Sequence, residues 1–89
     1  MSKDIDYIKN ELESDSRLDV ELYKGILSVD SDEWAEVPAT GVKPSNVQVC
    51  PVEYGYDVRP VDSGGERFEL SADEAVLVVK GYLKGEEMY

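Results

Sequence analysis

The C-terminal part of the chain most constrains the fold, because its sequence is typical of a helix with one broad apolar face. Ser71 and Glu74 have the spacing of a capping box, in which the serine caps the helix and the glutamate reaches back to the serine amide. Lys80 and Lys84 complement the negative end of the helix dipole, and Gly85 suits a left-handed cap. The apolar positions recur at helical spacing: Ala72, Ala75, Val76, Val79, Tyr82 and Leu83. So broad an apolar face must be buried against a second layer.

A second helix is predicted near the N-terminus, over residues 3–15, with Ser2 as its cap. Ile5, Ile8 and Leu12 give it one narrow apolar stripe. Most of this helix faces water, so its stability must come from packing on something else.

Between the two helices the hydrophobic period changes to two, which indicates β-strands. Leu18, Val20 and Leu22 alternate with polar residues, and Gly25 interrupts this pattern at a bulge or bend. After a turn at Asp30–Asp32, residues 33–37 are expected to return as the second strand of a hairpin.

Three further strands are expected. They cover residues 46–54, 56–61 and 67–70, and a turn at 62–65 connects the last two. Pro51 confines the first of them to a sheet edge or a bulge, since proline cannot donate to the ladder.

The predicted fold is therefore α+β: an N-terminal helix, an antiparallel sheet of four to five strands and a C-terminal helix, with both helices on one sheet face. With 89 residues, the chain is interpreted as one small domain over 1–89, with residues 1–2 and 86–89 frayed.

Charge restricts the function. The chain carries 20 acidic and 9 basic residues, a net charge of −11, and no histidine. This composition speaks against an imidazole metal site, a histidine-based catalytic dyad and a basic nucleic-acid surface. Cys50 is the single cysteine and has no histidine to activate it, so we expect it to be a small core or edge-strand residue. We expect no enzymatic activity, no cofactor and no metal.

A calcium loop is the nearest metal motif. Asp30, Asp32 and Glu33 resemble its start, but Ala35 and Gly41 occupy the places of its glycine and its distal glutamate. A tight turn is the better interpretation.

The acids also suggest a function. Asp19 and Glu21 are expected on one face of the first strand, and Asp57 and Glu69 alternate similarly with apolar residues in later strands. Same-face residues lie roughly 6.5–7 Å apart on a strand, close to the phosphate spacing along one DNA strand. Ordered carboxylates can thus imitate nucleic acid. This plan resembles, in general terms, the DNA-mimic inhibitors of phages and mobile elements.

Tyrosine and tryptophan outnumber phenylalanine, which suits a half-wet binding surface. Tyr54, Tyr56 and Trp34 are candidate anchors, although a core position for Trp34 is equally open. Leu77 should stand on the wet face of its helix, where together with Met88 and Tyr89 it would allow a homodimer. The complete set of candidate partner-binding residues is Asp19, Glu21, Trp34, Glu36, Glu53, Tyr54, Tyr56, Asp57, Glu69 and Leu77.

The expected function is a non-enzymatic acidic module, an inhibitor or adaptor that occupies a basic, nucleic-acid-binding surface of a protein partner. Two alternatives stay open: a small structural subunit of a virion or other assembly, and an antitoxin or immunity protein that neutralises a basic nuclease. The longest apolar run is 75–79, too short for a signal core or a membrane span, so a cytoplasmic location without nucleic-acid or membrane binding is expected.

Overall fold

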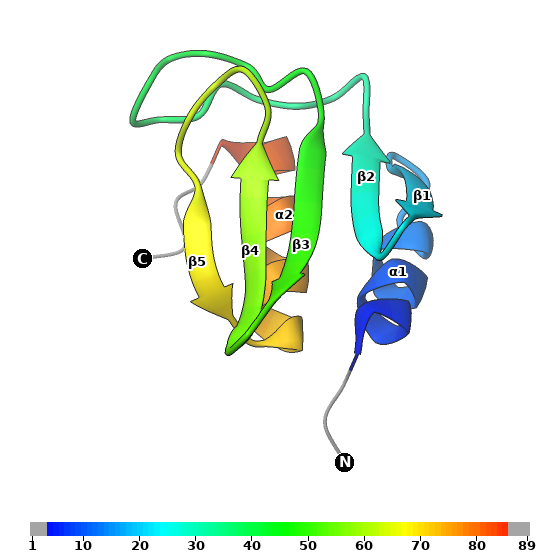
Figure 1. Cartoon of the computed structure of the whole chain (residues 1–89). Coiled ribbons are helices and arrows are strands. Elements are labelled where there is room, and N and C mark those ends of the chain that lie inside the picture. Colours follow the sequence, from blue (N-terminus) through cyan, green and yellow to red (C-terminus); the bar gives the residue numbers. More distant parts are fainter. Residues whose placement is uncertain (1–3, 86–89) are drawn as a thin grey trace.

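The computed structural model describes residues 4–85, which form two helices and five strands (Figure 1). In chain order these are α1 (Ile5–Glu13), β1 (Asp19–Tyr23), β2 (Ile26–Asp30), β3 (Val47–Val52), β4 (Gly55–Pro60), β5 (Arg67–Leu70) and α2 (Ala72–Lys84). The ends predicted to be frayed, residues 1–2 and 86–89, lie outside the described residues.

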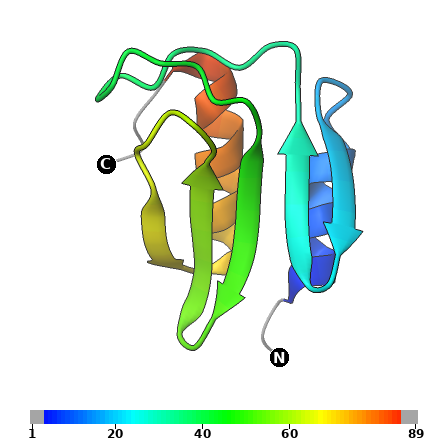
Figure 2. The same cartoon turned by 45° about the horizontal axis from the view of Figure 1, so that its top comes forward.

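The sheet is an antiparallel meander in which every strand pairs with its neighbour in sequence, in the order β1-β2-β3-β4-β5. Both helices lie behind this sheet, α1 behind the β1–β2 side and α2 behind the β3–β5 side (Figures 1 and 2). No helix of the described chain covers the opposite face. The predicted α+β architecture, with both helices on one sheet face, is confirmed.

The helix ends follow from local hydrogen bonding. Asp4, not Ser2, caps α1: its Oδ1 accepts from the amides of Asp6 at 3.1 Å and Tyr7 at 3.2 Å. Ser2 itself lies outside the described residues. The capping box of α2 is present as predicted, with Ser71 and Glu74 each accepting from the other's amide.

The first hairpin differs from its prediction. Gly25 does not bend a continuing strand; with Lys24 it forms the tight turn that joins β1 to β2. Both turn residues have positive φ, 51° for Lys24 and 79° for Gly25, as the twist-matched type I′ turn requires. Such turns are usually recognised from an asparagine–glycine pair, and lysine rarely adopts this conformation. The sequence at Lys24 and Gly25 therefore did not indicate a turn.

The prediction of a return strand at residues 33–37 is wrong. Residues 31–46 form a long connection over one end of the sheet, with a single bridge between Val37 and Val42 (Figure 1). The amide of Ala35 donates to the carbonyl of Tyr82 at 2.9 Å, so the connection bonds to the end of α2 instead of to β2.

β3 joins two parts of the sheet unequally. It pairs with β4 along its whole length, but with β2 through only three register pairs, from Leu27–Val49 to Val29–Val47. Pro51 lies beyond these pairs, where β3 is paired on one side only, as its missing N–H favours.

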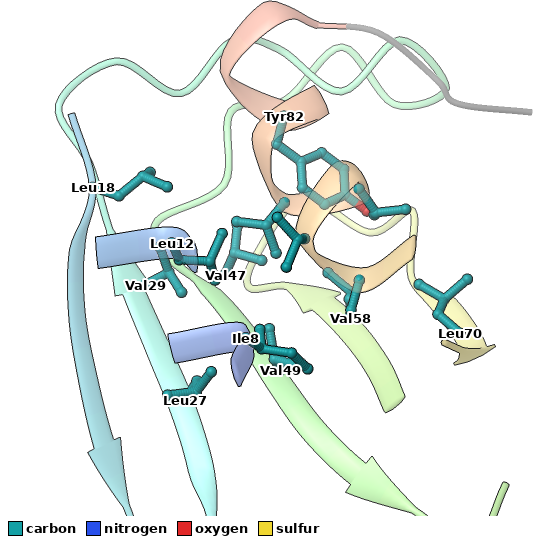
Figure 3. Close-up of a cluster of buried hydrophobic side chains, with 14 of the residues drawn as sticks. Ile8, Leu12, Leu18, Leu27, Val29, Val47, Val49, Val58, Leu70 and Tyr82 are labelled. Carbon is teal, nitrogen blue, oxygen red and sulfur yellow. The ribbon is translucent and has the colours of Figure 1, made fainter. Parts of the chain in front are cut away.

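The core fills the space between the sheet and the helices (Figure 3). Ile8 and Leu12 of α1 are completely buried, and all the predicted apolar positions of α2 are buried. The sheet contributes side chains with no exposed surface, Leu27, Val29, Val47, Val49 and Val58. Burying one such side chain stabilises a protein by about 1.5–3 kcal/mol. The Tyr82 hydroxyl reaches past the core and donates to the carbonyl of Gly65 at 2.8 Å.

Candidate functional site

The uncovered face of the sheet distributes its charge unevenly. Alternation along each strand turns one set of side chains away from the helices: Asp19, Glu21, Tyr23, Ile26, Ser28, Asp30, Gln48, Cys50, Asp57 and Arg59. The exposed acids of this set belong to β1 and the end of β2. Ser28, Gln48 and Arg59 form the middle, so the carboxylates do not make a continuous row across the sheet.

The two carboxylates of Asp19 and Asp30 come from residues that are directly opposed in the β1–β2 register, and both are exposed. Like charges in this position destabilise an antiparallel pair. Together with Asp32, they line an open depression of about 570 Å³, which we call the acidic depression. Its remaining lining residues are Ser16, Arg17, Leu18, Ser31 and Ser45.

Arg17 is the cation nearest to these acids along the chain, but its guanidinium is paired with Asp15. Its Nη2 donates to Oδ2 of Asp15 at 2.7 Å and its Nε donates to Oδ1 at 2.9 Å. This side-chain hydrogen bonding lowers the pKa of Asp15 to about 2, with help from the Arg17 amide. Within residues 4–85, Asp19, Asp30 and Asp32 form no ion pair, so their charges face solvent.

The predicted alternation in β1 is confirmed. Asp19 and Glu21 are exposed on the uncovered face, while Val20 and Leu22 are half-buried and pack against the core. These two acids are therefore available for a partner, as the sequence interpretation requires.

Asp57 and Glu69 do not extend this arrangement. Asp57 is only 7% exposed, and its Oδ1 accepts from the amide of Glu69 at 3.0 Å. The register shifts at this point, so that Phe68 and Glu69 of β5 stand opposite the single residue Asp57. Asp57 thus stabilises a β-bulge and offers no charge to a partner. Glu69 remains exposed.

The candidate aromatic anchors separate into different environments. Trp34 is 5% exposed and belongs to the core, so of the two roles left open by the sequence, the core position is correct. Tyr56 is half-buried against the core, and this burial raises the pKa of its phenol. Tyr54, in the turn between β3 and β4, is 74% exposed and is the one of the three that faces solvent.

The other candidates lie apart from the acidic depression. Glu36 is exposed in the 31–46 connection, Glu53 is exposed beside Tyr54, and Leu77 is 53% exposed on the outer side of α2. Two exposed aromatic residues were not predicted, Tyr23 and Phe68. The alternation in β1 could have predicted the exposure of Tyr23. Phe68 is exposed because of a bulge, which no local sequence pattern predicts.

No three acid or thiol groups within residues 4–85 are arranged to hold a metal ion. Cys50 is half-buried in β3. Neither described helix is long and apolar enough to cross a membrane. No protein-family model, curated protein or solved structure matches the chain.

Proposed function

We propose that this chain is a non-enzymatic acidic module that docks on a basic surface of a protein partner. The supporting observation is the Asp19–Asp30 pair, in which two exposed carboxylates oppose each other without a cation from residues 4–85. A lysine or arginine of a partner would relieve this repulsion on binding. The repulsion that destabilises the free fold would therefore add to the free energy of binding. The net charge of −11 favours encounter with such a surface.

The finer form of this proposal is that the partner's basic surface is a nucleic-acid-binding site. The chain would then act as an inhibitor or adaptor, in the manner of DNA mimics from phages and mobile elements. An antitoxin or immunity protein against a basic nuclease would use the same physics. Competition with duplex DNA for the partner tests this form.

The decisive variant is Asp30→Lys, compared with Glu11→Lys, which makes the same charge change at an exposed position of α1. Capture of a basic partner from host lysate should fall at least tenfold with Asp30→Lys and much less with Glu11→Lys. Raising the salt from low to high ionic strength should weaken wild-type capture steeply. Equal loss with both variants would show that only total charge matters and would overturn the assignment to this depression.

The stability of the same position gives a second readout. Asp30→Asn removes the like-charge contact, so the free energy of unfolding should rise by about 0.2–1 kcal/mol while partner binding weakens. Denaturant titration of the two proteins measures the change. A fall in stability would mean that the two carboxylates do not repel each other.

Self-association is the second candidate function, and the exposure of Leu77 favours it. A structural subunit would form stoichiometric assemblies that depend on this side chain more than on salt. Sedimentation velocity should then show an oligomer in the wild type that Leu77→Lys dissociates. The residues predicted to join this contact, Met88 and Tyr89, lie outside the described part of the chain.

A further inference from the structure

A second surface lies at the opposite edge of the sheet from the acidic depression. There β5 runs beside the start of α2 (Figure 1), and a shallow groove of about 480 Å³ follows this edge. We call it the β5 groove. Its lining residues are Glu66, Arg67, Phe68, Glu69, Leu70 and Glu74.

The β5 groove owes its form to the bulge. Glu69 has φ of 55°, a left-handed conformation that costs a non-glycine residue energy and persists only where its surroundings impose it. Here the buried Asp57 carboxylate imposes it by accepting a hydrogen bond from the Glu69 amide. The same carboxylate lies 3.6 Å from the guanidinium of Arg59. One consequence is that Phe68, instead of alternating inward, is 60% exposed at the groove.

Beside its own cation, Arg67, the groove combines three chemical properties. Phe68 offers an exposed aromatic ring, and Leu70, although buried, borders the groove with apolar surface. Glu66 and Glu69 are exposed, and within residues 4–85 neither forms an ion pair. A guanidinium group is recognised by this combination: it stacks on an aromatic ring, pairs with carboxylates, and has an apolar stem that packs against hydrocarbon. A lysine ammonium can also approach the ring and pack its stem, but it has neither a planar face that stacks on the ring nor a fork of donors that pairs with a carboxylate through two hydrogen bonds.

We propose that the β5 groove binds an arginine side chain of a protein partner. The lining has three glutamates against one cation, Arg67, so its net negative charge disfavours nucleic acid and anionic lipid as occupants, and repulsion between two chains of charge −11 disfavours a second copy. The inference rests on the proposed function for the sign of the partner's surface, and it adds the residue type that the partner presents.

The test is an NMR titration of the full chain with a capped peptide that carries one arginine between neutral residues, and with the same peptide carrying lysine. The arginine peptide should shift the amide signals of Phe68 and Glu69 and bind at least threefold more tightly. Phe68→Leu keeps an apolar side chain but removes the ring, so it should abolish the arginine preference. Tyr54→Leu is the matched control, because it removes an exposed ring outside the groove and should change nothing.

Circular dichroism on both variants verifies that the fold is retained. Equal affinity for the two peptides, shifts away from β5, or an unchanged preference in Phe68→Leu would overturn the inference. The Asp30→Lys variant distinguishes a failure of the arginine inference from a failure of the proposed function. This variant should bind the arginine peptide as the wild type does, so arginine binding at β5 stands even if the acidic depression has no partner.

Discussion

The two edges of this sheet place their unfavourable energy in different parts of the molecule. At β1 the ladder is regular, so apart from the positive φ of Lys24 in the turn, the cost lies in side chains, where Asp19 opposes Asp30. At β5 the cost lies in the backbone, where Glu69 adopts a positive φ, and the hydrogen bond from its amide to Asp57 holds this conformation and compensates for its cost. The same residue type is thus a solvent-facing charge at one edge and a buried acceptor at the other. Strand register, and not residue type, decides between these roles.

Glycine substitutions should break this contrast most strongly. A Cβ on Gly55 would overlap the carbonyl oxygen of Leu70, forcing β4 and β5 apart, whereas a Cβ on Gly25 would meet nothing within 4 Å. We expect Gly55→Ala to cost about 3 kcal/mol of unfolding free energy, and Gly25→Ala about 1 kcal/mol from its positive φ alone. Urea denaturation of both variants measures the difference. Equal costs would indicate that β5 yields without resistance.

Removing the acceptor of the bulge should have an intermediate effect. Asp57→Ala leaves the Glu69 amide without its partner, at a cost of about 1–3 kcal/mol. Asp57→Asn retains an acceptor oxygen and should recover most of this loss. Hydrogen exchange at the Glu69 amide provides the local readout, with faster exchange expected only in the alanine variant. Unchanged exchange in Asp57→Ala would mean that the bulge does not depend on the carboxylate.

The smallest effect is expected in the turn of the β1 edge. Lys24 adopts φ of 51°, which asparagine tolerates better than lysine. Lys24→Asn should therefore raise the unfolding free energy by about 0.5 kcal/mol, although it removes the ammonium that lies 5.3 Å from the Tyr23 ring centre. Thermal unfolding detects the shift. A destabilised variant would mean that the ring contact outweighs the backbone strain.

The sequence predicted those features that depend on neighbouring residues. The capping box at Ser71, the apolar face of α2 and the alternation of Asp19 and Glu21 with valine and leucine all arise from local periodicity, and all were confirmed. The exposed leucine at Leu77 follows from the same helical projection.

Features that depend on distant partners were missed. Residues 33–37 form no strand, because the Ala35 amide finds its acceptor at Tyr82, far along the chain. Asp57 is buried because β5 supplies an extra residue opposite it, and no pattern around Asp57 contains that information. The candidate site was therefore predictable at the β1 edge and hidden at the β5 edge.

The short ladder between β2 and β3 gives the molecule a dividing line. Only three register pairs, from Leu27–Val49 to Val29–Val47, cross it within the sheet. Strands β1 and β2 lie with α1 on one side and β3, β4 and β5 with α2 on the other (Figure 2), and the two helices contact each other across it. Opening along this line would break these three pairs and the packing between the helices, but it would keep the strand pairs within each part, so it would cost less than global unfolding.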